Sequence, residues 1–143
     1  MRELIFGGAR SGKSALAEKR AQESGLHVVY VATAQALDGE MQRRIAHHRA
    51  RRPASWGLVE SPLNLAATLR QHAEPGVCLL VDCLTLWVAN LLADADRLPP
   101  GASADELPLF RRERDALLAT LPTLAVFFAM QRRFVEGMLG SVK

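Results

Sequence analysis

Short apolar runs alternate with segments of helical periodicity along this chain. Apolar runs bounded by turn residues are typical of strands that are buried on both faces of a sheet. Segments whose apolar residues recur three or four positions apart are typical of helices that cover a sheet. The pattern predicts strands at residues 4–6, 28–32, 56–59, 77–81 and 124–129, and helices at residues 14–22, 38–50, 63–72, 84–92 and 109–121.

The alternation of strands and helices predicts an α/β fold with a mainly parallel sheet flanked by helices. A strand with its helix and connections takes about 30 residues or more. The 143 residues therefore have room for four or five such units in a single domain, residues 1–143. Residues 94–108, which contain three prolines and a glycine, are predicted to form a loop. In such a sheet, ligands bind at the carboxyl ends of the strands.

Composition excludes several classes of protein. Hydrophobic residues make up 49% of the chain and charged residues 23%, a balance that excludes an intrinsically disordered protein. The longest apolar stretch, residues 79–92, is interrupted by Asp82, Thr85 and Asn90, so no membrane span is expected. Two cysteines form no disulfide framework, and a cytoplasmic location is therefore expected.

The basic residues are mostly arginines, and many of them lie close together. The formal net charge is +3, with 15 arginines against 3 lysines, and five of the arginines fall between Arg43 and Arg52. A local cluster of this kind indicates a polyanionic ligand, which could be nucleic acid, a membrane surface or the phosphates of a nucleotide.

A phosphate-binding loop is predicted between the first strand and the first helix. Residues 7–14 read GGARSGKS and match G-x-x-x-x-G-K-[ST] in full. The glycines let successive backbone N–H groups point at the phosphates, and the helix that follows adds the partial positive charge of its N-terminus. Lys13 would reach the β- and γ-phosphates, and the Ser14 hydroxyl would coordinate Mg²⁺. The nucleotide-binding residues predicted here are Gly7, Gly8, Ala9, Arg10, Ser11, Gly12, Lys13 and Ser14.

A P-loop enzyme also needs a carboxylate on the metal side, and Asp82 is the candidate. It follows the apolar run at residues 77–81, at the end of a predicted strand, where it could hold Mg²⁺ directly or through water. The alternative is that Asp82 caps the helix predicted at residues 84–92, and the two roles are compatible. Thr85 and Asn90 in that helix are interpreted as a packing hydroxyl and a surface amide.

The helix predicted at residues 38–50, which Asp38 would cap, carries two histidines among arginines. Met41, Ile45 and His48 share one helical face, so His48 is predicted to point toward the body of the protein and His47 toward solvent. The segment could be a solvated basic face above a buried histidine. It could also be a nucleic-acid patch, although it lacks aromatic residues that stack on single strands. In a third interpretation, a neutral histidine attacks phosphorus while arginines hold the phosphate oxygens.

Together, these stretches resemble the family of bifunctional adenosylcobinamide kinase / adenosylcobinamide-phosphate guanylyltransferases of cobalamin biosynthesis. The similar stretches are FGGARSGKS at residues 6–14, VVYVATAQALDGEMQRRIAHHRARRPASW at residues 28–56 and LLVDCLTLWVANLL at residues 79–92. Any P-loop protein could carry the first stretch, but few combine it with ATAQ, EM and an H-R-x-x-R-P tract.

The resemblance implies a RecA-like P-loop domain that forms a homotrimer and has two activities. The first is phosphorylation of adenosylcobinamide with ATP or GTP. The second is transfer of GMP from GTP to adenosylcobinamide phosphate through a GMP-histidine intermediate, which gives adenosylcobinamide-GDP. The implied cofactor is Mg²⁺, and the implied partners are the nucleotides and the corrinoid rather than nucleic acid.

The resemblance also assigns roles to residues of this sequence. Through the H-R-x-x-R-P tract the nucleophilic histidine falls on His48, with His47 as the fallback, and Lys13 is the second catalytic residue. Ser14 and Asp82 are the implied metal ligands. The implied nucleotide-binding residues beyond the phosphate loop are Ala32, Thr33, Ala34, Arg49, Ala50, Arg51, Arg52, Glu60 and Asp82.

After residue 92 the resemblance weakens, and the chain is expected to be shortened relative to the family. The family has an Asn-Glu-Val-Gly loop after a strand, then a helix and a final strand. Here residues 124–130 are followed at once by residues 131–137, which resemble that later helix, and the final strand is missing. Because the Asn-Glu-Val-Gly loop lies beside the nucleotide in the family, its absence here is expected to affect both assembly of the trimer and catalytic turnover. One alternative function is another small-molecule P-loop kinase, in which the helix with the histidines and arginines only binds substrate. The other is a GTP-binding module that is inactive through loss of C-terminal segments.

Overall fold

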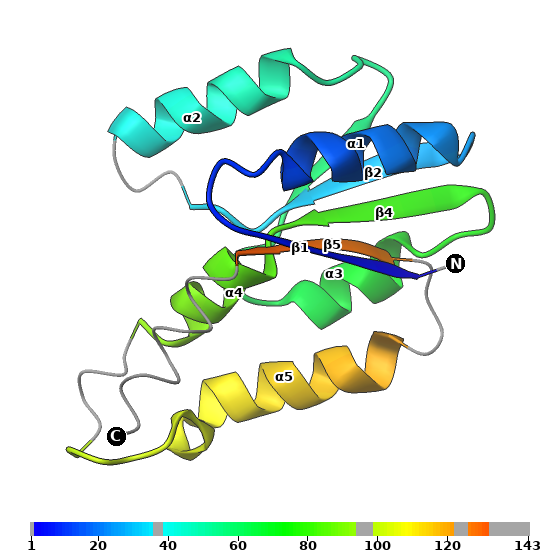
Figure 1. Ribbon diagram of the computed structural model, residues 1–143. Coiled ribbons are helices and arrows are strands. Elements are labelled where there is room, and N and C mark those ends of the chain that lie inside the picture. Colours follow the sequence, from blue (N-terminus) through cyan, green and yellow to red (C-terminus); the bar gives the residue numbers. More distant parts are fainter. Residues whose placement is uncertain (1, 36–38, 94–98, 122–125, 132–143) are drawn as a thin grey trace.

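Five parallel strands form one sheet. The computed structural model describes residues 2–35, 39–93, 99–121 and 126–131, which are arranged as in Figure 1. The strands lie in the order β1-β5-β4-β2-β3. All neighbouring pairs are parallel, so the five carboxyl ends lie along the same edge of the sheet. The strands are β1 (Glu3–Gly7), β2 (His27–Ala32), β3 (Gly57–Glu60), β4 (Val77–Asp82) and β5 (Val126–Gln131).

Helices cover both faces of this sheet. In Figure 1, α1 and α2 lie on one face, and α3, α4 and α5 lie on the other. The α/β fold with a parallel sheet flanked by helices, as predicted from the alternating pattern, is confirmed. The helices are α1 (Lys13–Glu23), α2 (Gly39–Ala50), α3 (Leu65–His72), α4 (Leu84–Leu91) and α5 (Pro108–Thr120), with a 3-10 turn at Ala104–Glu106.

The predicted elements are all present, and their ends differ from the prediction by a few residues. The predicted loop at residues 94–108 contains the 3-10 turn, whose first backbone N–H groups are capped by Ser103. Cys83 rather than Asp82 occupies the N-cap position of α4, so the alternative in which Asp82 caps that helix is wrong. Asp38, residues 94–98 and residues 132–137 lie outside the described residues.

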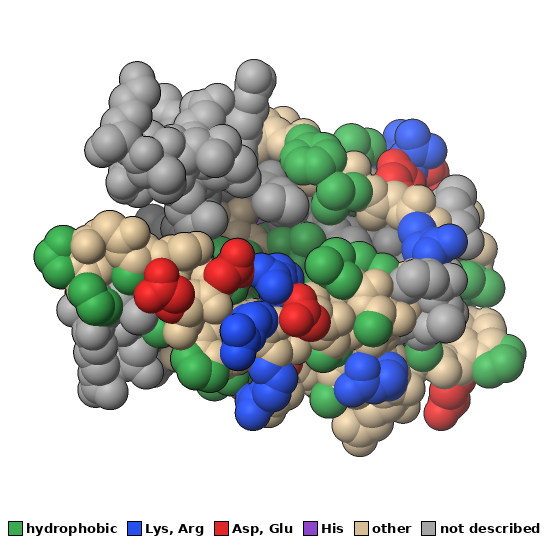
Figure 2. Space-filling model, turned by 90° about the horizontal axis from the view of Figure 1, so that it is seen from below, with side chains coloured by type: hydrophobic (Ala, Val, Ile, Leu, Met, Phe, Trp, Pro, Cys, Tyr) green, Lys and Arg blue, Asp and Glu red, His purple; other side chains and the backbone are tan. Residues whose placement is uncertain are grey.

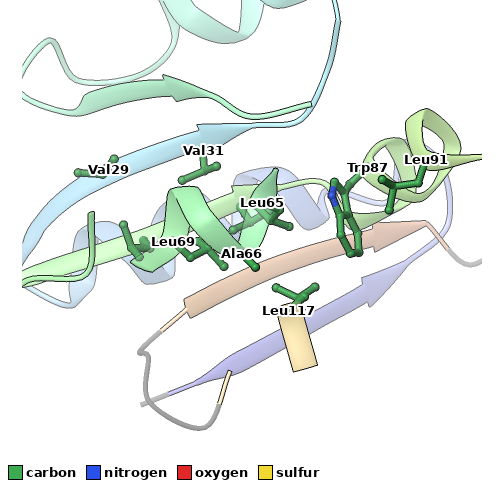
Figure 3. Close-up of a cluster of buried hydrophobic side chains, with 10 residues drawn as sticks. Val29, Val31, Leu65, Ala66, Leu69, Trp87, Leu91 and Leu117 are labelled. Carbon is green, nitrogen blue, oxygen red and sulfur yellow. The ribbon is translucent and has the colours of Figure 1, made fainter. Parts of the chain in front are cut away.

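Two apolar layers hold the helices on the sheet, because successive residues of a strand point to opposite faces. The layer beneath α3, α4 and α5 contains the odd-numbered residues of β2 and β4. Figure 3 shows residues of this layer, among them Val29, Val31, Leu65, Ala66, Leu69, Trp87, Leu91 and Leu117. The layer beneath α1 contains the even-numbered residues Val28, Tyr30, Cys78 and Leu80. Asp82, which is also even-numbered, ends β4 on the side that faces α1 and α2.

The surface on the α5 side carries charges of both signs. Figure 2 shows this side, where Lys and Arg side chains lie beside Asp and Glu side chains. One such group joins Arg114 to Asp105 and Asp115. Among the described residues, no helix combines the length and the apolar character that crossing a membrane would need.

Candidate nucleotide-binding site

The loop between β1 and α1 is a tight turn that leads directly into the helix. Gly12 forms the N-cap of α1 with φ 82°, a left-handed conformation that glycine adopts at little cost. Gly7 lies against the side chain of Ser11, and an added Cβ would come within 2.4 Å of the Ser11 Oγ. Lys13 begins α1, is 8% exposed, and its Nζ donates a hydrogen bond to the carbonyl oxygen of Gly8 at 3.1 Å. The Lys13 side chain therefore points back toward its own loop, where its ammonium group could contact a bound phosphate.

The last residues of three neighbouring strands are in register beside this loop. Ala32 of β2 pairs with Glu60 of β3 on one side and with Asp82 of β4 on the other. Sequence analysis selected all three as site residues although they lie far apart in the chain. The parallel pairing brings two carboxylates to the same edge of the sheet as the phosphate loop.

A cavity of about 330 Å³ opens at this edge, between the sheet and α2. Met41, Ile45 and His48 line it from α2, as their helical spacing predicted. His48 is half-buried, whereas His47 is exposed. The predicted site residues that line this cavity are Ser14, Ala32, Ala34, His48, Arg49, Arg52, Glu60 and Asp82.

Other predicted site residues lie outside the lining of this cavity. In the phosphate loop these are Gly7, Gly8, Ala9, Arg10, Ser11, Gly12 and Lys13. Ala50 and Arg51 are exposed. Thr33 is fully buried. The cavity lining therefore includes Ser14 and Asp82, which are the predicted metal ligands, together with residues of α2. The loop that would hold the phosphates lies next to it.

Tyr30 is a cavity residue that the sequence analysis did not select. Its hydroxyl donates a hydrogen bond of 2.5 Å to the Oδ2 atom of Asp82. The guanidinium carbon of Arg52 lies 3.2 Å from the centroid of the Tyr30 ring, and the Nε atom of Arg52 lies 3.4 Å from the Oε1 atom of Glu18 in α1. Burial, followed by the nearby Asp82 carboxylate, raises the pKa of Tyr30 far above its ordinary range. The phenol therefore stays protonated and remains a donor at neutral pH.

No pattern in the sequence pointed to this contact, because it depends on how two strands pair. In the observed register Tyr30 lies opposite Leu80 and Ala32 lies opposite Asp82, so Tyr30 and Asp82 share a face of the sheet. Sequence analysis provided neither this register nor the strand order that makes the two strands neighbours. A second cavity of about 290 Å³ adjoins the first and is lined by Tyr30, Arg49, Arg52 and Trp56 among others.

Buried polar groups support the loops behind the cavity. The Thr33 hydroxyl donates to the carbonyl oxygen of Cys83 at 2.7 Å and accepts from its N–H at 2.8 Å. The amide nitrogen of Asn90 donates to the carbonyl oxygens of Thr33 at 2.8 Å and Pro62 at 3.0 Å. The interpretation of Asn90 as a surface amide is therefore wrong, because it ties α4 to the loops that follow β2 and β3. Thr85 is buried, in agreement with a packing hydroxyl.

The cavity offers oxygen donors for a hard cation. Within residues 2–35, 39–93, 99–121 and 126–131, no group of three His, Cys, Asp or Glu side chains could hold a metal ion. The Ser14 hydroxyl and the Asp82 carboxylate do line the same cavity. Such a pair fits Mg²⁺, which protein sites usually hold with one or two side chains together with waters and substrate phosphates.

Comparison with known proteins identifies relatives of this chain. The profile of the family described as cobinamide kinase / cobinamide phosphate guanyltransferase matches residues 3–129. The bifunctional adenosylcobalamin biosynthesis protein CobP of Pseudomonas aeruginosa is 61% identical over 124 residues, which cover 87% of this chain and 66% of that protein. The bifunctional adenosylcobalamin biosynthesis protein CobU of Escherichia coli is 45% identical over 91 residues, which cover 64% of this chain and 50% of that protein. The protein of the same name from Salmonella typhimurium is 43% identical over 89 residues, or 62% of this chain and 49% of that protein. The chain thus spans about half to two thirds of the length of the curated relatives that it matches.

Proposed function

We propose that this chain, which belongs to the cobinamide kinase / cobinamide phosphate guanyltransferase family, binds GTP at the carboxyl edge of its sheet and transfers GMP through His48. The phosphate loop also serves a kinase step in this proposal, with ATP or GTP as the phosphoryl donor and adenosylcobinamide as the acceptor. The observation that carries the proposal is the single cavity lined by Ser14, Asp82 and His48. A bound nucleotide would place its phosphates on the loop and its metal between Ser14 and Asp82. It would then lie beneath α2, the helix that carries His48.

The kinase step relies on positioning and charge. A hydroxyl oxygen of adenosylcobinamide attacks the γ-phosphorus, the bond from that phosphorus to its bridging oxygen breaks, ADP or GDP leaves, and the hydroxyl proton passes to solvent. The backbone N–H groups of the loop and the buried Lys13 ammonium stabilise negative charge on the transferred group. The hydrogen bond from Lys13 to the Gly8 carbonyl keeps the ammonium at the loop before a phosphate arrives.

The transfer step uses His48 as a nucleophile. A ring nitrogen of His48 attacks the α-phosphorus of GTP, an N–P bond forms, and the bond to the bridging oxygen breaks so that pyrophosphate leaves. An oxygen of adenosylcobinamide phosphate then attacks the same phosphorus, the N–P bond breaks, and adenosylcobinamide-GDP is released. Arg49 lines the cavity one residue after His48 and would hold the phosphate oxygens during both attacks.

Mg²⁺ is the metal that we propose for both steps. The Ser14 hydroxyl and the Asp82 carboxylate would hold it, directly or through water. When bound, the ion would neutralise part of the phosphate charge.

Trapping of the covalent intermediate tests the proposal. The 143-residue chain is incubated with Mg²⁺ and GTP labelled at the α-phosphate, and the protein is then separated under alkaline conditions. We expect the wild-type chain and the His47→Ala variant to retain acid-labile GMP, and the His48→Ala variant to retain none. His47 is a matched control, because it lies on the same helix turn and is exposed.

The other outcomes separate the alternative functions. Equal labelling of the two variants would contradict His48 as the nucleophile. Phosphorylation of adenosylcobinamide without any covalent GMP would indicate another small-molecule kinase, and GTP affinity without any product would indicate a binding module. Measurement of the molecular size in the same samples tests the homotrimer that the family resemblance implies.

A further inference from the structure

We propose that Tyr30 is a positioning residue that fixes the Asp82 carboxylate for the metal, and that Arg52 and Glu18 hold the Tyr30 ring in the required place. This inference rests on the proposed function, because it concerns the metal side of the same nucleotide site. It assigns to Arg52 a role that acts through Tyr30 rather than on the nucleotide. The four residues come from β2, β4, α1 and the segment that follows α2.

The hydrogen bond to Tyr30 fixes the orientation of the carboxylate. Asp82 ends β4 without a helix-capping role, and its Oδ2 atom accepts the Tyr30 hydroxyl proton at 2.5 Å. A carboxylate that is held at one oxygen cannot rotate freely about its Cβ–Cγ bond, so the direction of Oδ1 is fixed as well. Groups that orient a metal ligand in this way typically change metal affinity by 10-fold to 100-fold when they are removed.

The Tyr30 ring is itself held on two sides. It is 3% exposed and packs into the apolar layer beneath α1. The Arg52 guanidinium lies over the ring at 3.2 Å from its centroid, which is a cation–π contact. The ring therefore has little freedom to turn away from Asp82.

The Arg52 guanidinium contacts a carboxylate as well as the Tyr30 ring. Its Nε atom lies 3.4 Å from the Oε1 atom of Glu18, and the Arg52 and Glu18 side chains are 10% and 17% exposed. An ion pair with so little access to water is screened less than a surface pair. Arg49, by contrast, is exposed and lines the same cavity. The two arginines therefore differ in role, with Arg49 available to phosphate oxygens and Arg52 joined to Tyr30 and to the helix that follows the phosphate loop.

The test measures the Mg²⁺ dependence of nucleotide binding rather than turnover. Binding of α,β-methylene GTP, which cannot lose pyrophosphate, is measured by calorimetry over a range of Mg²⁺ concentrations and in EDTA. For Tyr30→Phe, which retains the ring but lacks the hydroxyl, we expect the Mg²⁺ concentration at half-maximal effect to rise by about 10-fold or more. Binding in EDTA should stay at the wild-type value.

Arg52→Gln gives the second arm. We expect it to raise the Mg²⁺ requirement in the wild-type background and to have no further effect in the Tyr30→Phe background, because a residue that acts through another is not additive with it. Arg49→Gln is the matched control and should weaken binding in EDTA and in Mg²⁺ to the same extent.

The outcomes distinguish this inference from the proposed function. A wild-type Mg²⁺ requirement in Tyr30→Phe would overturn the positioning role of Tyr30. Weakened binding in EDTA for Arg52→Gln, additive with Tyr30→Phe, would mean that Arg52 contacts the nucleotide directly. Mg²⁺-dependent binding that responds to Tyr30→Phe, in a chain that traps no covalent GMP, would contradict only the proposed transfer. Absence of any Mg²⁺-dependent binding would contradict both.

Discussion

Replacement of Asn90 tests how much its side-chain amide, which joins the loops after β2 and β3 to α4, contributes to the stability of the protein. The Asn90 Nδ2 atom donates to the carbonyl oxygens of Thr33 and Pro62, at 2.8 Å and 3.0 Å. Asn90→Ala removes both donors and leaves two carbonyl groups that have been partly withdrawn from water. A hydrogen bond contributes about 0.5–1.5 kcal/mol net, so the two together predict a loss of about 1–3 kcal/mol in the free energy of unfolding.

Asn90→Asp tests the same two hydrogen bonds more specifically than Asn90→Ala, because it removes the donors but keeps the size of the side chain. A carboxylate cannot donate to the two carbonyl oxygens and is repelled by them, so at neutral pH we expect a loss at least as large as that of Asn90→Ala. The carbonyl oxygens disfavour the charged form, and the pKa of this aspartate in the folded state would lie above its ordinary value of about 3.9. Since the folded state then binds the proton more tightly than the unfolded state, the defect should shrink as the pH falls toward that ordinary value and grow as the pH rises.

Urea unfolding at pH 7 and pH 4.5, followed by circular dichroism, measures both effects. Asn64→Ala is the matched control, because Asn64 is exposed and its side chain makes no capping hydrogen bond to α3. We expect the control to change the free energy of unfolding by less than about 0.5 kcal/mol. The reasoning would be refuted if Asn90→Ala were as stable as the control, or if Asn90→Asp lost stability on acidification relative to the wild-type chain.

Three further predictions follow from burial and from the phosphate loop. Leu65→Ala in the fully buried core should lower the free energy of unfolding by about 2–5 kcal/mol in urea, and a loss below 1 kcal/mol would contradict the packing in Figure 3. Burial raises the pKa of both Cys78 and Cys83, so the thiols of the folded chain should react slowly with a thiol reagent at pH 8 and rapidly in urea. Rapid reaction of both thiols in the folded chain would contradict their burial. Lys13→Ala should weaken binding of α,β-methylene GTP, measured by calorimetry, by 10-fold or more, and wild-type affinity would exclude the loop as the phosphate site.

The features that could be predicted from the sequence are those that depend on residues close together in the chain. The apolar run before Asp82 and the glycines around Lys13 specify a strand end and a phosphate loop locally. The helical spacing of Met41, Ile45 and His48 was enough to place His48 on the cavity side of α2, and the structure confirms that orientation.

The remaining features depend on contacts between residues that are distant in sequence. β5 lies between β1 and β4, and the periodicity of a strand contains no information about its neighbours in the sheet. The Tyr30 hydroxyl and the Asp82 carboxylate are 52 positions apart, and the Arg52 and Glu18 side chains are 34 positions apart. Sequence analysis interprets Asn90 as a surface amide. In the structure Asn90 donates hydrogen bonds to the carbonyl oxygens of Thr33 and Pro62. No local sequence pattern predicts these two contacts.

Mass spectrometry of the GTP-treated chain tests the central claim most directly. The wild-type chain is incubated with GTP and Mg²⁺, digested under alkaline conditions, and the peptide that contains His47 and His48 is fragmented. We predict a mass increase of one GMP group on His48, lost after brief treatment with acid. A GMP group on His47, or an unmodified peptide from a chain that binds GTP in the same buffer, would contradict the proposal that His48 carries the guanylyl group.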